Sequence, residues 1–89
     1  MSPKTREELR LLILTTIAAA KGYAIPLDGI RLGLPAQHRR MEGDDLQAEV
    51  QYLVDKGFVA PESKRLSPEN REWKITAEGR DYLATEGLA

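Results

Sequence analysis

The chain has 89 residues, of which 42% are hydrophobic and 30% are charged, so it can form one modest hydrophobic core with a well-solvated surface. It contains no cysteine, which excludes disulfide bonds, thiolate metal sites and cysteine nucleophiles and is compatible with the reducing cytoplasm where we expect it. The formal net charge of −1 lacks the basic bias of many DNA-binding domains, so any contact with nucleic acid must depend on where the charges lie.

The first predicted element is an amphipathic helix over about residues 4–21. Ser2 followed by Pro3 is typical of a helix start, and Thr5 offers a capping box as an alternative. Lys21 and Gly22 are typical of a helix end. Positions spaced by three and four residues predict one apolar face, made of Leu9, Leu12, Ile13, Thr16, Ile17 and Ala20.

The longest uncharged run, Leu11–Ala20, is too short to span a bilayer. It follows basic residues, as in a signal peptide, but Glu7 and Glu8 stand among them and the run has helical periodicity. We therefore interpret it as part of a soluble helix and expect no membrane contact.

The stretch between residues 23 and 43 carries weaker signals. Ala24–Pro26 is expected to be extended, because proline biases the preceding residue away from the helix. A short second helix is predicted over about residues 27–33, and Gly33 or Pro35 ends it. Residues 36–43 then form a polar connection. The apolar residues expected to be partly buried here are Leu27, Ile30, Leu32 and Leu34.

The third helix, over about residues 45–56, has the clearest local pattern. Asp44 is placed to cap its first turn, with Gln47 three residues later in the capping-box position. Gly57 fits the position just past the end, where Phe58 would pack back on Leu53 in a Schellman arrangement. The apolar face consists of Leu46, Val50, Leu53 and Val54.

A hairpin is predicted over about residues 58–75. Phe58–Ala60 begins a strand, Ser67–Asn70 has a turn signal, and Trp73–Ile75 alternates as a returning strand does. Thr76 then caps a last helix over about residues 77–86, on which Tyr82 and Leu83 provide the apolar contact.

The motif Leu53–Val59, followed at hairpin distance by Trp73–Gly79, resembles the winged helix-turn-helix regulators of the MarR, PadR and ArsR type. Those families commonly end the recognition helix with leucine, two or three residues, glycine and an aliphatic residue. The second strand of their wing then leads into a motif of isoleucine or leucine, threonine, any two residues and glycine. The match covers roughly residues 44–83 and is specific for the fold, not for one family.

The resemblance implies an α+β fold that is mainly helical with a small β-hairpin. A three-helix core, a two-stranded wing and a C-terminal helix would form one domain over residues 1–89. In such proteins the third helix usually enters the major groove of DNA, and many dimerise through terminal helices. A small transcription regulator bound to double-stranded DNA, as a monomer or homodimer, is the function that we expect.

Base readout requires outward polar side chains on the third helix, and phosphate binding requires cations beside it. Glutamine can pair with adenine, and tyrosine can touch a phosphate or a thymine methyl group. The blander interpretation is a solvated helix face and solubilising loop charges. The candidate DNA-binding residues are Gln47, Gln51 and Tyr52 on the helix, His38, Arg39 and Arg40 before it, and Lys64, Arg65 and Arg71 on the wing.

Acidic residues oppose this interpretation. Asp44 and Asp55 lie on the predicted outward face of the third helix, which lacks Arg and Lys at its centre. Residues 58–75 hold four basic and three acidic side chains, whereas residues 76–89 hold one basic and three acidic, so the last helix would face away from DNA. The alternative hypothesis is the same fold used as a protein-protein interaction module, with Gln51, Tyr52 and Asp55 facing a partner.

Catalysis has no support in the sequence. It has no glycine-rich phosphate loop, no paired-histidine motif and no nucleophile with an adjacent base. His38 is the single histidine, so a second histidine or a cysteine to complete a metal site is missing. We expect neither an enzyme nor a bound cofactor or metal.

Overall fold

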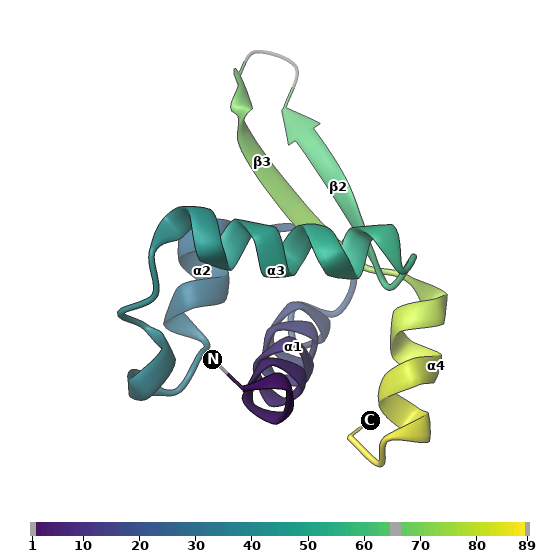
Figure 1. Cartoon of the computed structure of the whole chain (residues 1–89). Helices are drawn as coiled ribbons and strands as arrows, with labels where there is room; N and C mark the ends of the chain where they lie inside the picture. The colour runs from purple at the N-terminus through teal and green to yellow at the C-terminus, as the bar shows by residue number, and fades with distance from the viewer. Residues whose placement is uncertain (1, 65–66, 89) are drawn as a thin grey trace.

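The computed structural model describes residues 2–64 and 67–88, and the side chains of residues 2–62 and 71–88. In Figure 1 a hairpin projects from a group of helices, and α3 crosses its base. The elements in chain order are α1 (Pro3–Ala18), β1 (Ile25–Pro26), α2 (Leu27–Leu32), a short 3₁₀ helix (Ala36–His38), α3 (Gly43–Asp55), β2 (Val59–Lys64), β3 (Ser67–Ile75) and α4 (Ala77–Thr85). The expected class, mainly helical with a small antiparallel sheet, is confirmed.

The sheet has three strands in the order β1-β3-β2 within the described residues, one strand more than the predicted two-stranded hairpin. β2 and β3 form the predicted antiparallel hairpin, with Val59 opposite Ile75. The extended conformation expected at Ala24–Pro26 is observed as β1, whose Ile25 lies opposite Trp73. Pro26 has no amide hydrogen to donate, and α2 begins directly after it, which limits β1 to two residues.

The N-terminus of α1 is capped by Ser2, whose hydroxyl accepts a hydrogen bond from the Thr5 amide at 3.2 Å. The alternative cap at Thr5 is therefore wrong. The helix also ends earlier than expected, because Lys21 and Gly22 both adopt positive φ values, 54° and 93°, and reverse the chain. No helix in the described part of the chain is long and apolar enough to cross a membrane.

The core is built around α1, which packs against the sheet and the other three helices. Leu14 is fully buried although it lies beside the predicted apolar face, because α4 covers a second side of α1. Leu32 was expected to be partly buried but is 71% exposed, since Ile30 and Leu34 occupy the inward direction of this short segment. The buried residues are Leu9, Ile13, Leu14, Ile17, Ile30, Leu34, Leu46, Val50, Leu53, Val59, Trp73, Ile75 and Leu83.

The two ends of α3 differ in how well local chemistry predicted them. Glu42 occupies the N-cap position without a side-chain hydrogen bond, and Asp44 lies in the first turn, so the predicted Asp44 cap is wrong. A first-turn carboxylate still interacts favourably with the helix dipole. The Schellman end is confirmed: Gly57 has φ 82°, its amide donates to the Val54 carbonyl at 2.9 Å, and the Phe58 amide donates to the Leu53 carbonyl at 3.0 Å.

Thr76 connects the end of α3 to the start of α4. Its hydroxyl donates to the Gly57 carbonyl at 2.7 Å and accepts from the Gly79 amide at 3.0 Å, which confirms the predicted cap. Its own amide donates to the Phe58 carbonyl at 3.1 Å. One residue therefore ties the helix end, the first residues of the hairpin and the last helix together.

Gly79 lets α4 approach the hairpin, because a Cβ atom there would overlap the Phe58 carbonyl oxygen. We expect Gly79→Ala to lower the free energy of unfolding by about 1–3 kcal/mol, through overpacking against backbone. Gly43→Ala is the matched control, since its Cβ would meet only the Arg31 side chain at 3.8 Å. The control should change stability by less than about 1 kcal/mol. Urea denaturation measures both, and equal stability of the two variants would contradict the close approach.

Candidate functional site

The outward face of α3 is acidic. Asp44, Ala48, Gln51 and Asp55 are all exposed on it, and α3 contains no Lys or Arg. The Gln51 side-chain amide donates to a carboxylate oxygen of Asp55 at 2.9 Å, so this candidate base-reading group is already paired within the helix. Gln47 is exposed on the neighbouring flank. Of the helix residues proposed to read bases, Gln47 is the most available.

Tyr52 lies on a different side of α3 from Gln51, because consecutive helical residues are about 100° apart. Its ring packs under α1, with the Arg10 guanidinium carbon 3.5 Å from the ring centroid. The Lys56 amine lies 5.6 Å from the same centroid. The Arg10 guanidinium thus covers one face of the Tyr52 ring, and 36% of the residue remains exposed.

Glu49 joins α3 to α1 through two arginines. Its carboxylate accepts a hydrogen bond from Arg10 Nε at 2.6 Å and lies 3.5 Å from Arg6 Nε. The Glu49 side chain is 12% exposed, so the pair is shielded from solvent more than an ordinary surface ion pair. The sequence pattern did not indicate this contact; the one available signal was that Arg6 and Arg10 are four residues apart on one helix face.

The connection before α3 is held by arginines. Arg39 Nε donates to the Leu34 carbonyl at 2.8 Å. Arg31 Nη1 donates to the Arg39 carbonyl at 2.8 Å and to the Met41 carbonyl. Arg39 and Arg40 nevertheless remain exposed, whereas His38 is half-buried at the end of the short 3₁₀ helix. This segment therefore presents two cations in a fixed backbone just ahead of α3.

Arg71 is the one hairpin candidate whose side chain the structure describes. It is exposed on β3, where its backbone lies opposite Ser63 of β2. The next position pairs Glu62 with Glu72, which places two carboxylates on neighbouring strands. The candidates Lys64 and Arg65 lie outside the residues whose side chains the structure describes.

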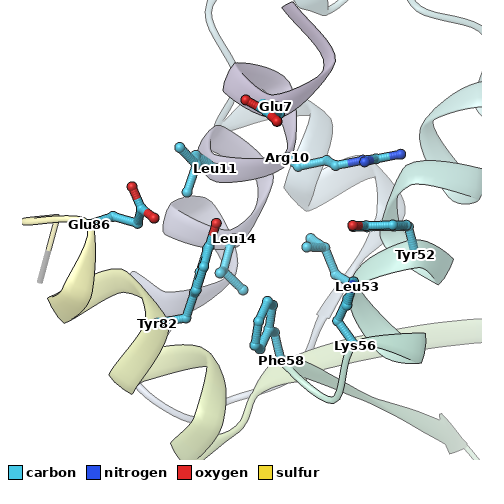
Figure 2. A pocket seen from close by; sticks show the side chains of 10 residues that line it. All are labelled: Glu7, Arg10, Leu11, Leu14, Tyr52, Leu53, Lys56, Phe58, Tyr82 and Glu86. Atoms are coloured by element: carbon cyan, nitrogen blue, oxygen red, sulfur yellow. The ribbon is translucent and has the colours of Figure 1, made fainter. Parts of the chain in front are cut away.

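A cavity of about 400 Å³ lies among α1, α3 and α4, on the side of α3 that carries Tyr52. Figure 2 labels its ten lining side chains and shows Glu7 and Glu86 toward the α1–α4 side and Tyr52 and Lys56 on the α3 side. The rings of Phe58 and Tyr82 stack within it, with centroids 4.6 Å apart and planes 15° from parallel. None of the expected site residues except Tyr52 lines this cavity.

Burial raises the pKa of the Tyr82 phenol above its ordinary value near 10, and the nearby Glu86 carboxylate raises that pKa further. The phenol therefore stays protonated and neutral across the physiological pH range.

His, Asp and Glu side chains form no group of three that could hold a metal ion within the described residues. No family model, curated protein or solved structure matches the chain. The function must therefore be inferred from the geometry of the chain itself.

Replacing Glu49 tests the link between α1 and α3. We expect Glu49→Gln to lower the free energy of unfolding by roughly 1–2 kcal/mol, between the values for exposed and buried pairs, because two arginines lose their shared carboxylate. Glu8→Gln, which changes an exposed residue of α1, should change the free energy of unfolding by less than about 0.5 kcal/mol. The measurement is chemical denaturation at neutral pH and low salt, and indistinguishable variants would show that the pair contributes nothing.

The Tyr82 phenol should make stability fall at high pH. The unfolded chain releases this proton near pH 10, whereas the folded chain holds it to higher pH, so the stabilising contribution is complete below pH 10 and is lost as pH rises through the folded pKa. Tyr82→Phe should therefore show a shallower loss of stability above pH 10. Tyr23→Phe is the control, because that side chain is 79% exposed. Identical alkaline slopes for wild type and Tyr82→Phe would contradict the assignment.

Proposed function

We propose that this chain is a winged helix-turn-helix module. Its elements follow the order helix, strand, helix, helix, strand, strand, helix, and β1 closes the sheet by pairing with β3 of the hairpin. α3 keeps one face open to solvent and lies beside a hairpin that projects from the helices, as a recognition helix lies beside a wing (Figure 1). The order of the elements and the sheet pairing together support this assignment.

The module binds double-stranded DNA, and it does so mainly through phosphate contacts. The observation that carries this proposal is the position of Arg39 and Arg40, which are exposed immediately before the N-terminus of α3. Both arginines supply formal positive charge, whereas Glu42 at the N-cap and Asp44 and Asp45 in the first turn offset the partial positive charge of the helix N-terminus. Arg71, Lys64 and Arg65 add charge on the hairpin. These groups suit the sugar-phosphate backbone, which carries no sequence information by itself.

Base readout is limited in this arrangement. Gln47 is free to pair with a base, but Gln51 is bonded to Asp55 and would have to leave that partner. Asp44 and Asp55 repel phosphates when α3 approaches the groove. The protein therefore binds DNA weakly, with little sequence preference and strong dependence on salt. A homodimer would double the number of phosphate contacts and would suit a regulator of transcription.

A second function is favoured by the acidity of α3. An exposed face with Asp44, Gln51 and Asp55 suits a basic surface of a protein partner better than it suits a phosphate backbone. In that case the same module would be an interaction domain without DNA binding. Neither function is enzymatic.

Titration of a labelled mixed-sequence duplex at low and at moderate salt separates the two functions. We expect measurable binding at low salt that weakens steeply as salt rises, because counterions released from the phosphates set the affinity. The double variant Arg39→Ala/Arg40→Ala should lose at least about tenfold in affinity and reduce the salt slope by roughly 2.

Two further variants control this experiment. Arg80→Ala removes an exposed cation from α4 and should bind like the wild type. Arg39→Ala removes a charge and also the hydrogen bond to the Leu34 carbonyl that supports the connection. Arg40→Ala alone therefore tests the loss of a charge without the loss of that bond. An absence of binding at low salt, or equal binding by the wild type and the double variant, would contradict the DNA proposal and favour the protein-binding function.

A further inference from the structure

Arg31 of α2 bonds to the connection that leads from α2 into α3, residues 33–42. Its Nη1 donates to the backbone carbonyls of Arg39 and Met41. Its Nη2 lies 3.8 Å from the position that a Cβ atom would take at Gly43, the first residue of α3. One guanidinium therefore contacts both the end of the connection and the start of α3.

The backbone on both sides of Arg31 is held by the core. Ile30 is fully buried and Leu34 is 1% exposed. At Gly33 a Cβ atom would overlap the Thr16 side chain of α1, and the Thr16 hydroxyl donates to the Gly33 carbonyl at 3.4 Å. The Arg31 side chain therefore extends from backbone that α1 and the core keep in place.

The connection itself lies mostly outside the core. Met41 packs partly buried against the core, whereas residues 36–37 and 39–40 are exposed. A second bond to the connection comes from Arg39, whose Nε donates to the Leu34 carbonyl at 2.8 Å. A guanidinium has five N–H donors, so Arg39 can make this bond and bind a phosphate at the same time. The arrangement of the exposed arginines thus depends on a few side-chain bonds to backbone carbonyls.

The half-buried Arg31 supports backbone and does not pair with a carboxylate. The groups that it bonds are neutral carbonyls, and it forms no ion pair among the residues whose side chains the structure describes. A hydrogen bond from a charged donor is stronger than one between neutral groups. The two bonds therefore hold the connection more firmly than neutral donors would.

We propose that Arg31 is a positioning residue for DNA binding, which holds the connection in the arrangement that presents Arg39 and Arg40 to phosphates. This inference rests on the proposed binding of DNA through those two arginines. Arg31 does not contact DNA itself, because its Nη1 is engaged with the connection. Without its two bonds the connection samples several arrangements, and the apparent affinity falls with the fraction that is competent to bind.

The first test is amide nitrogen relaxation by NMR on the protein without DNA. Arg31→Lys keeps the charge, but its shorter side chain with a single ammonium group cannot bridge both carbonyls as the guanidinium does. The order parameters of residues 39–42 should be near 0.85 in the wild type, as in rigid backbone, and should fall below about 0.6 in Arg31→Lys. Unchanged order parameters in α3 and α4 would show that the variant is folded.

The second test is titration of the same protein with the labelled mixed-sequence duplex. Arg31→Lys should bind about threefold to tenfold more weakly than the wild type, with the same salt slope, because the number of cations that contact phosphates is unchanged. A role in stability alone would leave the affinity of the folded protein unchanged. Arg80→Lys, the same substitution at an exposed residue of α4, should match the wild type in both tests.

Three results would overturn the proposal while leaving the proposed function in place. These are an ordered connection in Arg31→Lys, equal DNA binding by Arg31→Lys and the wild type, and a fall in salt slope together with affinity. The last result would show that Arg31 contacts a phosphate directly. An absence of DNA binding by the wild type would instead contradict the proposed function and this inference together.

Discussion

The arrangement of the whole second half of the chain depends on the hydrogen bonds of Thr76. This residue bonds to the carbonyls of Gly57 and Phe58 and to the amide of Gly79, so it joins the end of α3, the start of the hairpin and the start of α4. The absence of a side chain at Gly79 permits the close packing that these bonds require. α3 and the hairpin meet at this junction. The geometry of the junction therefore determines whether α3 and the hairpin can contact the same binding partner.

The junction also shapes the cavity on the opposite side. It places α4 so that Tyr82 stacks on Phe58, the residue just before β2. α1 completes this side, because it supplies Leu14 and Arg10 to the cavity while Glu49 ties it to α3. One flank of α3 is therefore committed to packing, ion pairing and the cavity. The face with Asp44, Gln51 and Asp55 stays open, and its acidity shifts any DNA contact toward the arginines before the helix.

Local chemistry predicted those features that a few neighbouring residues determine. The Schellman end at Gly57 and the Thr76 cap follow from short motifs, and both are observed. The Asp44 cap failed because the preceding Glu42 and Gly43 also permit a helix start, and the sequence does not rank them. The pairing of β1 with β3 was not predicted, since a two-residue strand has no detectable period.

The candidate site was less predictable, because it depends on contacts between distant segments. Tyr52 was expected to face outward with Gln51, but Arg10, more than forty residues earlier, covers its ring. Glu49 was not a candidate at all, although two arginines converge on it. Arg39 was identified by its charge and its position before the third helix, whereas its bond to the Leu34 carbonyl depends on the fold of the connection.

The central claim is that DNA contacts the segment before α3 and the hairpin. The most direct test is an NMR titration of isotopically labelled protein with a duplex at low salt. The account predicts the largest amide shifts in residues 36–43 and in the hairpin, with the amides of α4 unchanged. Shifts concentrated in α1 and α4, or no shifts at saturating duplex, would contradict it.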